Sequence, residues 1–274
     1  MSPITVLGAS GFIGSALTKR LEETRVDYFA PGRNESLLDR PLGHVIYCIG
    51  LTADFRSRPF ETVEAHVCHL GRVLRDCDFK SLTYLSSARI YPRSGAPAVE
   101  GNLLQVRSSN PNDLYNISKI MGESLSLASG KTVRVVRLSN VYGDDFASQN
   151  FLPTVIKEAI SKGRVTVNNS PEAEKDYISI HDVVDGLLHI AVDARQNIYN
   201  LASGKNISNQ VLLQKISKLT GCEVNFDLAS AKISFPEISI ERICSEFDFR
   251  PRYLLDDLGE LIDSYRRHSQ GHRS

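Results

Sequence analysis

A tyrosine and a lysine, Tyr115 and Lys119, lie four residues apart in a stretch, 112–129, whose pattern predicts a helix. That spacing places both side chains on one face of the helix, with the ammonium near the phenol. A free tyrosine ionises at pH ~10, and a neighbouring positive charge lowers its pKa because it favours the phenolate. The pair therefore predicts a general acid–base group that exchanges a proton at neutral pH.

Glycines recur three residues apart near the beginning of the chain. They follow a short apolar run, 4–7, and precede an amphipathic stretch, 15–23, which predicts a strand, a turn and a helix. Glycine lets the backbone turn tightly and approach a pyrophosphate, and the helix N-terminus points free N–H groups at phosphates. The residues expected to contact a dinucleotide in this turn are Gly8, Ser10, Gly11, Phe12, Ile13 and Gly14.

The end of the second predicted strand, 26–30, bears on the choice between NAD and NADP. An acidic side chain there binds the ribose 2′-hydroxyl of NAD, whereas an arginine accommodates the 2′-phosphate of NADP. Here the strand is followed by Pro31, Gly32 and Arg33, and the nearest carboxylate, that of Glu35, comes later. We therefore expect NADP(H) rather than NAD, with Arg33 as a contact; the alternative is that Arg33 is a solvated surface charge.

Predicted strands and helices alternate along the first half of the chain. The strands are expected at 4–7, 26–30, 44–49, 82–86 and 133–138, and the helices at 15–23, 59–76 and 112–129. This alternation indicates an α/β protein with a doubly wound parallel Rossmann sheet. Only about ten residues separate Arg33 from His44, so the usual third strand is expected to be short or missing.

The pattern changes in the second half of the chain. Helices are expected at 151–162, 181–194, 208–220, 239–247 and 254–267, and strands at 165–167, 177–180 and 197–201. We expect 1–150 to form the dinucleotide-binding domain, with 176–201 returning to it. Segments 151–175 and 202–267 are expected to form a smaller, interleaved C-terminal substrate lobe. The last residues, 268–274, have the composition of a frayed tail.

Composition excludes several classes of function. Thirty-two basic residues balance 32 acidic ones, so no global field attracts nucleic acid or anionic lipid. Five cysteines without Cys-x-x-Cys spacing argue against a disulfide framework or a zinc site and suit a reducing compartment. No apolar run approaches the ~20 residues that span a bilayer, and the early first strand leaves no room for a signal peptide. We expect a cytoplasmic protein that binds no metal, membrane or nucleic acid.

Several segments carry recurring motifs in a fixed order: 8–14, 84–91, 115–119, 137–143 and 175–183, followed by 199–204 and 249–251. Together they resemble the extended short-chain dehydrogenase/reductase family, the group of NAD(P)-dependent nucleotide-sugar epimerases, dehydratases and reductases. The resemblance covers nearly the whole chain. Five or more motifs in the right order are far more specific than any one of them.

The resemblance implies roles for Ser87, Tyr115 and Lys119 as the catalytic residues. Ser87 would hydrogen-bond the substrate carbonyl or hydroxyl, although capping a turn is the alternative for this hydroxyl. Tyr115 would exchange the proton. Lys119 would bind the nicotinamide ribose and lower the pKa of Tyr115, and Gly50 would also contact the cofactor.

The resemblance also implies a nucleotide-sugar substrate, held by Asn140 and Lys175; a simple turn asparagine is the alternative for Asn140. Relatives have Arg-Asp where this chain has Lys-Asp, which keeps the positive charge and loses bidentate geometry. The 4,6-dehydratases have Thr-Asp-Glu where this chain has Ser87, Ala88 and Arg89. The missing acid and base argue against dehydration.

We expect an NADP(H)-dependent oxidoreductase that reduces a 4-keto group of a nucleoside-diphosphate sugar. The alternatives are an epimerase with tightly held NAD and a non-catalytic NADP(H)-sensing protein, against which the complete Ser-Tyr-Lys set argues. As in relatives, a homodimer is expected through the helices at 59–76 and 112–129. His66 and His69 lack a further metal ligand in sequence, so a core or interface role is favoured.

Overall fold

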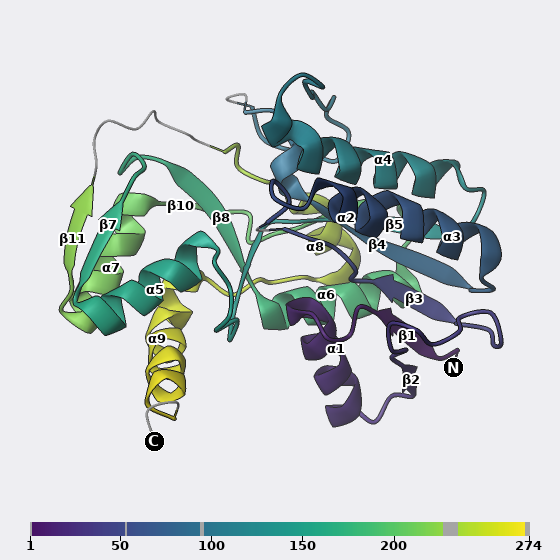
Figure 1. Ribbon diagram of the computed structural model, residues 1–274, viewed down its shortest axis with the longest axis horizontal. Helices are drawn as coiled ribbons and strands as arrows, with labels where there is room; N and C mark the ends of the chain where they lie inside the picture. Colours follow the sequence, from purple (N-terminus) through teal and green to yellow (C-terminus); the bar gives the residue numbers. More distant parts are fainter. Residues whose placement is uncertain (1, 53, 94–95, 227–234, 272–274) are drawn as a thin grey trace.

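The computed structural model describes residues 2–52, 54–93, 96–226 and 235–271 (Figure 1). Within these ranges, six strands form one parallel sheet in the order β2-β1-β3-β4-β5-β9. The strands are β1 (Ile4–Leu7), β2 (Tyr28–Phe29), β3 (His44–Tyr47), β4 (Ser81–Ser87), β5 (Val133–Leu138) and β9 (Ile198–Leu201). The expected fold class, a doubly wound Rossmann sheet, is confirmed.

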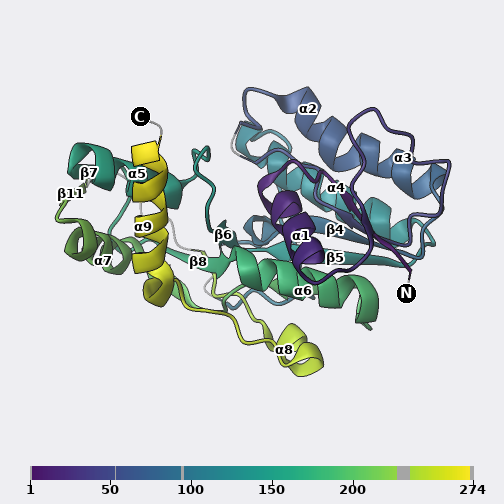
Figure 2. The same cartoon turned by 90° about the horizontal axis from the view of Figure 1, so that it is seen from below.

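Helices cover both faces of this sheet, which explains why every residue of β1 and of β3 is buried. On one face lie α1 (Phe12–Glu23) and α6 (Ile180–Asp193); on the other lie α2 (Pro59–Val63), α3 (His69–Asp76) and α4 (Leu114–Ala128) (Figures 1 and 2).

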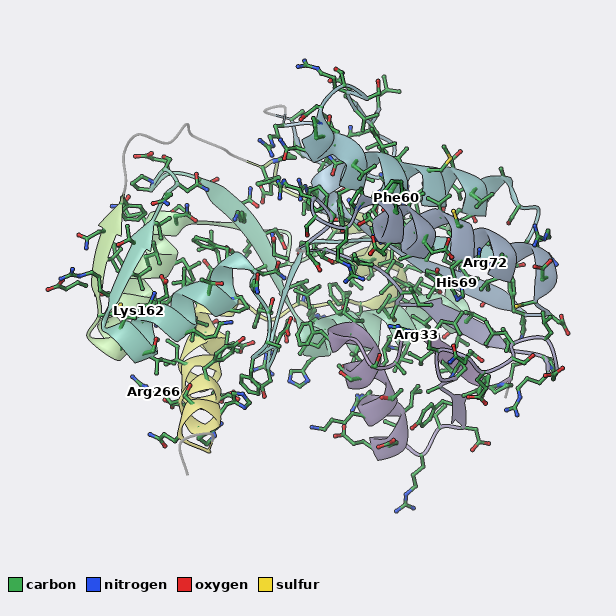
Figure 3. The ribbon with its side chains drawn as sticks, in the orientation of Figure 1. Arg33, Phe60, His69, Arg72, Lys162 and Arg266 are labelled. Atoms are coloured by element: carbon green, nitrogen blue, oxygen red, sulfur yellow. The ribbon has the colours of Figure 1, made fainter. Side chains whose placement is uncertain are left out.

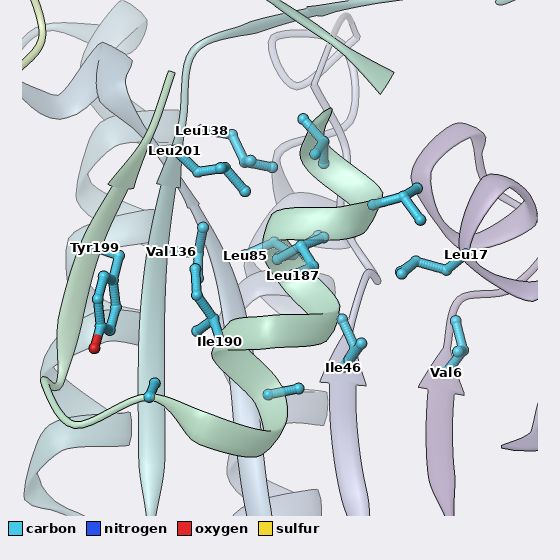
Figure 4. Close-up of a cluster of buried hydrophobic side chains, with 14 of the residues drawn as sticks. Val6, Leu17, Ile46, Leu85, Val136, Leu138, Leu187, Ile190, Tyr199 and Leu201 are labelled. Atoms are coloured by element: carbon cyan, nitrogen blue, oxygen red, sulfur yellow. The ribbon is translucent and has the colours of Figure 1, made fainter. Parts of the chain in front are cut away.

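The core between the sheet and its first helical layer is built from aliphatic side chains. Leu17 of α1 and Leu187 and Ile190 of α6 are fully buried against Val6 and Val136 of the sheet (Figure 4). On the opposite face Leu70 and Val73 of α3 pack with Tyr47 and Leu82. Each face of the sheet packs on its own apolar core. The strand ends, and the residues that follow them, are therefore held in fixed positions.

The edge of the sheet at β2 is shorter than expected. β2 has two residues rather than the five expected at 26–30, and it pairs only with Ile4 and Thr5. Pro31 lies two residues after the end of β2 and has no N–H to donate to a ladder. No strand forms between Ala30 and Gly43, where all residues are described, so the prediction of a missing third strand is confirmed.

The helix expected at 59–76 is divided by a π-helical turn, η1 (Glu64–Cys68), which separates α2 from α3. A π-turn leaves backbone carbonyls without their ordinary helical partners. The carbonyl of Ala65 accepts a hydrogen bond of 2.7 Å from the Tyr47 hydroxyl, and the carbonyl of His66 accepts one of 3.2 Å from Tyr84. Two tyrosines from the sheet therefore stabilise the irregular turn.

A smaller lobe with its own core lies beside the sheet domain (Figure 1). It contains the sheet β10-β8-β6, the parallel pair β11-β7, and three helices. The strands are β6 (Asn140–Tyr142), β7 (Arg164–Val167), β8 (Glu174–Ser179), β10 (Asn206–Ser208) and β11 (Glu223–Phe226); the helices are α5 (Phe151–Lys162), α7 (Asn209–Thr220) and α9 (Leu254–Gly271).

Two elements depart from the expected division of the chain. The helix α8 (Glu241–Phe247), expected in the smaller lobe, packs on the sheet domain because Ile243 is fully buried in that domain's core. The helix α9 continues to Gly271 through residues expected to be frayed. The His268 ring stacks on Phe146 with centroids 4.0 Å apart, and this contact holds the last turns. No helix in the described ranges is long and apolar enough to cross a membrane.

Candidate active site

The glycine turn after β1 has a backbone that side chains would obstruct. Gly8 has φ +87°, in the left-handed region. A Cβ on Gly14 would lie 2.2 Å from the carbonyl oxygen of Gly8, so α1 packs on the turn only because residue 14 is glycine. Gly11 caps α1 without a side-chain hydrogen bond, and the first turn of α1 has no acidic residue. The N-terminus of α1 can therefore accept an anion.

The expected pair on α4 shares one buried face. Tyr115 is 4% exposed and Lys119 is 5% exposed, and the Lys119 Nζ lies 6.0 Å from the centroid of the Tyr115 ring. The Lys119 ammonium donates a hydrogen bond of 2.8 Å to the backbone carbonyl of Leu85 on β4. A Cβ on Gly50 would lie 3.5 Å from Lys119 Nζ. The structure therefore brings Tyr115, Lys119 and Gly50 together.

Burial dominates the proton affinities at this site. It lowers the pKa of Lys119 to about 7, while the nearby carboxylate of Glu123 opposes the shift. Burial also raises the pKa of Tyr115 above its ordinary value, while Ser87, Arg89 and Thr52 act in the opposite direction. The expectation that Lys119 depresses the pKa of Tyr115 is therefore wrong here: the net shift is upward, and the cation that acts on the phenol is Arg89.

Ser87 is the last residue of β4 and faces Tyr115. Its Oγ caps the short 3-10 helix η2 (Ala88–Ile90) by accepting a hydrogen bond of 3.2 Å from the backbone N–H of Arg89. The turn-capping alternative for Ser87 is thus part of the structure. Because a hydroxyl donates and accepts at once, the same group also lowers the pKa of Tyr115.

His66 connects the site to the loop after β3, a contact that the sequence analysis did not predict. Its Nε2 accepts a hydrogen bond of 3.2 Å from the backbone N–H of Leu51, so Nδ1 carries the proton and donates to Ser118 Oγ at 2.8 Å. Ser118 donates in turn to the carbonyl of Tyr115. Burial lowers the pKa of His66 to about 2, helped by Lys119, which keeps the ring neutral.

The core role expected for His66 is confirmed, since its side chain is fully buried. Among the described residues, no group of three or more histidine, cysteine or acidic side chains could hold a metal ion.

A buried ion pair joins β5 to α4, the helix that carries Tyr115 and Lys119. Glu123, one turn beyond Lys119, receives hydrogen bonds of 3.0 and 2.7 Å from Arg137 on β5. Arg137 also donates to the Tyr91 hydroxyl at 3.0 Å, and Tyr91 donates to Asn200 at 2.6 Å. Polar residues repeated at four-residue spacing on a buried helix face were the sequence signal for this network, which fixes α4 on the sheet.

The loop after β2 holds both charges relevant to the cofactor. Arg33 is exposed in this loop (Figure 3). The carboxylate of Glu35, which the sequence placed too far along, turns back and accepts a hydrogen bond of 3.1 Å from the N–H of Gly32. A carboxylate therefore lies near the end of β2, contrary to the expectation of none.

Asn140 and Lys175 lie on adjacent strands of the smaller sheet. The Asn140 amide donates a hydrogen bond of 2.7 Å to the carbonyl of Asp176, and Lys175 Nζ lies 4.5 Å from the centroid of the Phe151 ring. Burial lowers the pKa of Lys175. The buried carboxylate of Asp176 accepts three hydrogen bonds from the loop at Ser203 and Lys205, which orders the segment beside these strands.

A doubly wound parallel sheet with a glycine turn after its first strand defines the class of Rossmann-type dinucleotide-binding proteins. Residues 4–202 match the NAD dependent epimerase/dehydratase family, and the chain belongs to that family. The resemblance to extended short-chain dehydrogenases/reductases is thereby confirmed.

A curated UDP-glucose 4-epimerase from Lactobacillus helveticus is 26% identical over 194 residues, which are 61% of this chain and 57% of that protein. The chain thus spans little more than half of this relative. The solved structure of MoeE5 in complex with UDP-glucose and NAD has a TM-score of 0.82 at 22% identity, over 97% of this chain and 99% of that one. RMD from Pseudomonas aeruginosa, complexed with NADPH, has a TM-score of 0.81 at 20% identity, over 98% and 100%. At these identities the likeness shows the fold.

Proposed function

We propose that the chain is an NADP(H)-dependent oxidoreductase that reduces a 4-keto group of a nucleoside-diphosphate sugar. The observation that carries this proposal is the buried pair of Tyr115 and Lys119 beside the Ser87 hydroxyl. Burial keeps the pKa of Tyr115 above its ordinary value, so the phenol holds its proton at neutral pH. A protonated phenol is what reduction requires, because the keto oxygen must receive a proton.

The glycine turn fits a dinucleotide. The left-handed backbone at Gly8 and the absence of side-chain atoms at Gly14 leave room for a pyrophosphate at the N-terminus of α1. In this proposal the turn residues Ser10, Gly11, Phe12 and Ile13 also contact the cofactor. A nicotinamide held there supplies the hydride when it is bound.

Each remaining residue has a proposed task toward the substrate or cofactor. Ser87 donates a hydrogen bond to the keto oxygen, and Tyr115 donates the proton to that oxygen. Lys119 and Gly50 hold the nicotinamide ribose. On the smaller sheet Asn140 and Lys175 hold the nucleotide sugar, where the Lys175 ammonium faces the diphosphate. Uridine is the first base to test, since MoeE5 was solved with UDP-glucose.

The choice of NADP(H) rests on Arg33, and Glu35 is its competitor. Arginine suits a 2′-phosphate, whereas a carboxylate suits a 2′-hydroxyl. We expect Arg33→Ala to weaken NADPH binding by about tenfold or more, the worth of one charged hydrogen bond, and to leave NADH binding unchanged. Glu35→Gln is the matched variant. Equal affinity of the wild type for both cofactors would contradict the preference for NADP(H), and a loss of NADH binding alone in Glu35→Gln would make NAD the cofactor.

An epimerase is the second candidate, favoured by the UDP-glucose 4-epimerase relative and by the carboxylate of Glu35 near Gly32. An epimerase reoxidises its own cofactor in every cycle and gains from holding it tightly. The two functions are separated by denaturing the purified protein, identifying any released nucleotide, and following NADPH with a 4-keto uridine nucleotide sugar. Stoichiometric NADPH oxidation supports the reductase. Released NAD⁺ with sugar interconversion and no net NADPH loss supports the epimerase.

A sensing protein without turnover remains the candidate from another class. It needs the cofactor turn but has no use for a proton donor beside a hydroxyl. Binding of NADPH without NADPH oxidation by any 4-keto nucleotide sugar, and without epimerisation, would favour it over both enzymes.

A further inference from the structure

Arg89 reaches into the site from the turn after β4. Its guanidinium carbon lies 5.3 Å from the centroid of the Tyr115 ring and 5.0 Å from that of Phe55. Phe55 is almost fully buried and lies 5.5 Å from the Tyr115 ring. Stacking on two packed aromatic rings restricts the direction in which this cation can point.

The charges around Arg89 are mostly positive. The guanidinium carbon of Arg56 also lies over the Phe55 ring, 4.5 Å from its centroid, and the charges of Arg56 and Arg93 both disfavour the protonated form of Arg89. Asp113 is the acid that acts on Arg89, and its carboxylate already accepts the backbone N–H of Arg107 at 2.9 Å.

No ion pair among the described residues includes Arg89, Arg56 or Arg93. The hydrogen bond that the Arg89 side chain makes is long, 3.5 Å from its Nη2 to the carbonyl of Asn112. A half-buried guanidinium that meets other cations and has no carboxylate partner is costly unless a ligand supplies the anion. This cluster is therefore built for an anionic group.

We propose that Arg89 binds a carboxylate on the sugar, so that the substrates are nucleoside-diphosphate uronates or their 4-keto forms. The inference rests on the proposed function, in which Tyr115 acts at C4 of the sugar. The carboxylate of a uronate is attached to C5, the carbon next to C4, and so lies beside the group that Tyr115 contacts. A guanidinium donates two parallel hydrogen bonds to a carboxylate. The neutral hydroxymethyl group that replaces the carboxylate in a hexose cannot accept this bidentate pair.

The nucleotide diphosphate is the other anion that could meet this cluster. In the proposed function it lies at Lys175, on β8 of the smaller lobe, and Arg89 follows β4 of the sheet domain. The experiment therefore also measures the binding of UDP, which has the diphosphate without the sugar.

Binding of UDP-glucuronate, UDP-glucose and UDP is measured by calorimetry with the protein saturated with NADP⁺. We expect the wild type to bind UDP-glucuronate at least about tenfold more tightly than UDP-glucose. Arg89→Met should weaken the binding of UDP-glucuronate by about 30-fold or more. This is the lower end of the loss in affinity seen when one partner of a buried charge pair is truncated. The same substitution should change the affinity for UDP-glucose and for UDP by less than about threefold. Arg89→Lys, which keeps the charge and loses the fork, should fall in between.

Arg107→Met is the matched control, because its side chain is exposed and its contact to Asp113 is made by the backbone. It should leave all three affinities unchanged. Equal binding of UDP-glucuronate and UDP-glucose by the wild type overturns the inference and leaves the proposed function standing. An equal loss of all three ligands in Arg89→Met assigns the arginine to the diphosphate and also overturns it. If the wild type binds none of the three, the inference is overturned, whereas the proposed function, which does not depend on uridine, is judged by its own NADPH-oxidation test.

Discussion

At the scale of single residues, two opposing influences act on the pKa of Tyr115. Burial stabilises its neutral form, whereas Ser87, Arg89 and Thr52 stabilise the phenolate. Lys119, the cation expected to act on the phenol, directs its ammonium to the carbonyl of Leu85 instead. In the proposed function the phenol donates the proton, and its charged form is stabilised by neighbours from the end of β4, from the turn that follows it and from the loop after β3.

Tyr115→Phe removes one oxygen and leaves the ring packing on Phe55 intact. We expect turnover with a 4-keto nucleotide sugar to fall by about 10²–10⁴, the usual worth of a positioned acid–base group. The affinity for NADPH should stay within about twofold. Steady-state NADPH oxidation and fluorescence titration measure the two quantities. Tyr253→Phe, in the smaller lobe, is the control, and near-normal turnover of Tyr115→Phe would show that another group donates the proton.

The sequence predicted which residues of the site lie together better than it predicted their protonation. Four-residue spacing was enough to place Tyr115 and Lys119 on one buried face. The direction of the Tyr115 pKa shift depends on burial by Phe55 and on the direction of Arg89, which are contacts between distant segments. Glu35 was misjudged for a similar reason, since its hydrogen bond to Gly32 depends on a loop conformation that spacing does not specify.

At the scale of elements, the packing of α1 on β1 depends on one missing side chain. A Cβ on Gly14 would lie 2.2 Å from the oxygen of Gly8 and 2.8 Å from the Cα of Ala9, and both contacts are to backbone. Neither atom can yield by changing a rotamer. The helix would have to move away from the turn that it positions.

Gly14→Ala should therefore destabilise the fold by about 1–3 kcal/mol and abolish NADPH binding at concentrations that saturate the wild type. Chemical unfolding and fluorescence titration measure the two effects. Gly259→Ala on α9 is the control of opposite sign, because nothing lies within 4 Å of its added Cβ. That change should stabilise the protein by about 0.5–1 kcal/mol. A Gly14→Ala protein with wild-type stability and NADPH affinity would contradict the packing argument.

The π-turn between α2 and α3 brings the buried His66 against α4. The sequence predicted one uninterrupted helix at 59–76 because its apolar pattern continues through the turn. What interrupts it is tertiary: the hydroxyls of Tyr47 and Tyr84 take the carbonyls of Ala65 and His66. Local pattern cannot contain a hydrogen bond to a strand elsewhere in the chain.

His66 should give the fold a measurable sensitivity to acid. Its folded pKa, about 2, lies below the unfolded value near pH ~6.5, so between these values the unfolded chain binds a proton that the native protein does not. The free energy of unfolding then falls as the pH falls below about 6.5, by up to about 1.4 kcal/mol per pH unit from this group. His66→Asn should make that dependence shallower between pH ~6 and ~4 in urea unfolding. The exposed His189→Asn should leave it unchanged, and an unchanged slope in His66→Asn would contradict the assignment.

At the scale of the whole molecule, the chain crosses between two lobes several times. The sheet domain takes back α6 and β9 after β8, and α8 returns to it later through Ile243. Alternation of strands and helices was sufficient to predict the sheet and the presence of a second lobe. It could not assign α8, because a seven-residue helix with one fully buried residue fits either core equally well by pattern.

The outer face of α2 and α4 carries exposed apolar side chains, and it is here that we expect a second copy of the chain to bind. Phe60 is 85% exposed, Met121 is 52% exposed and Leu127 is 44% exposed, and the two helices lie side by side (Figures 1 and 3). Met121→Arg should convert a dimer into a monomer, with the dimer dissociation constant raised at least about 100-fold by an unpaired charge in the interface. Light scattering after gel filtration measures the mass. Val192→Arg, equally exposed on α6 across the sheet, should remain dimeric, and a monomeric wild type or a dimeric Met121→Arg would rule out this face.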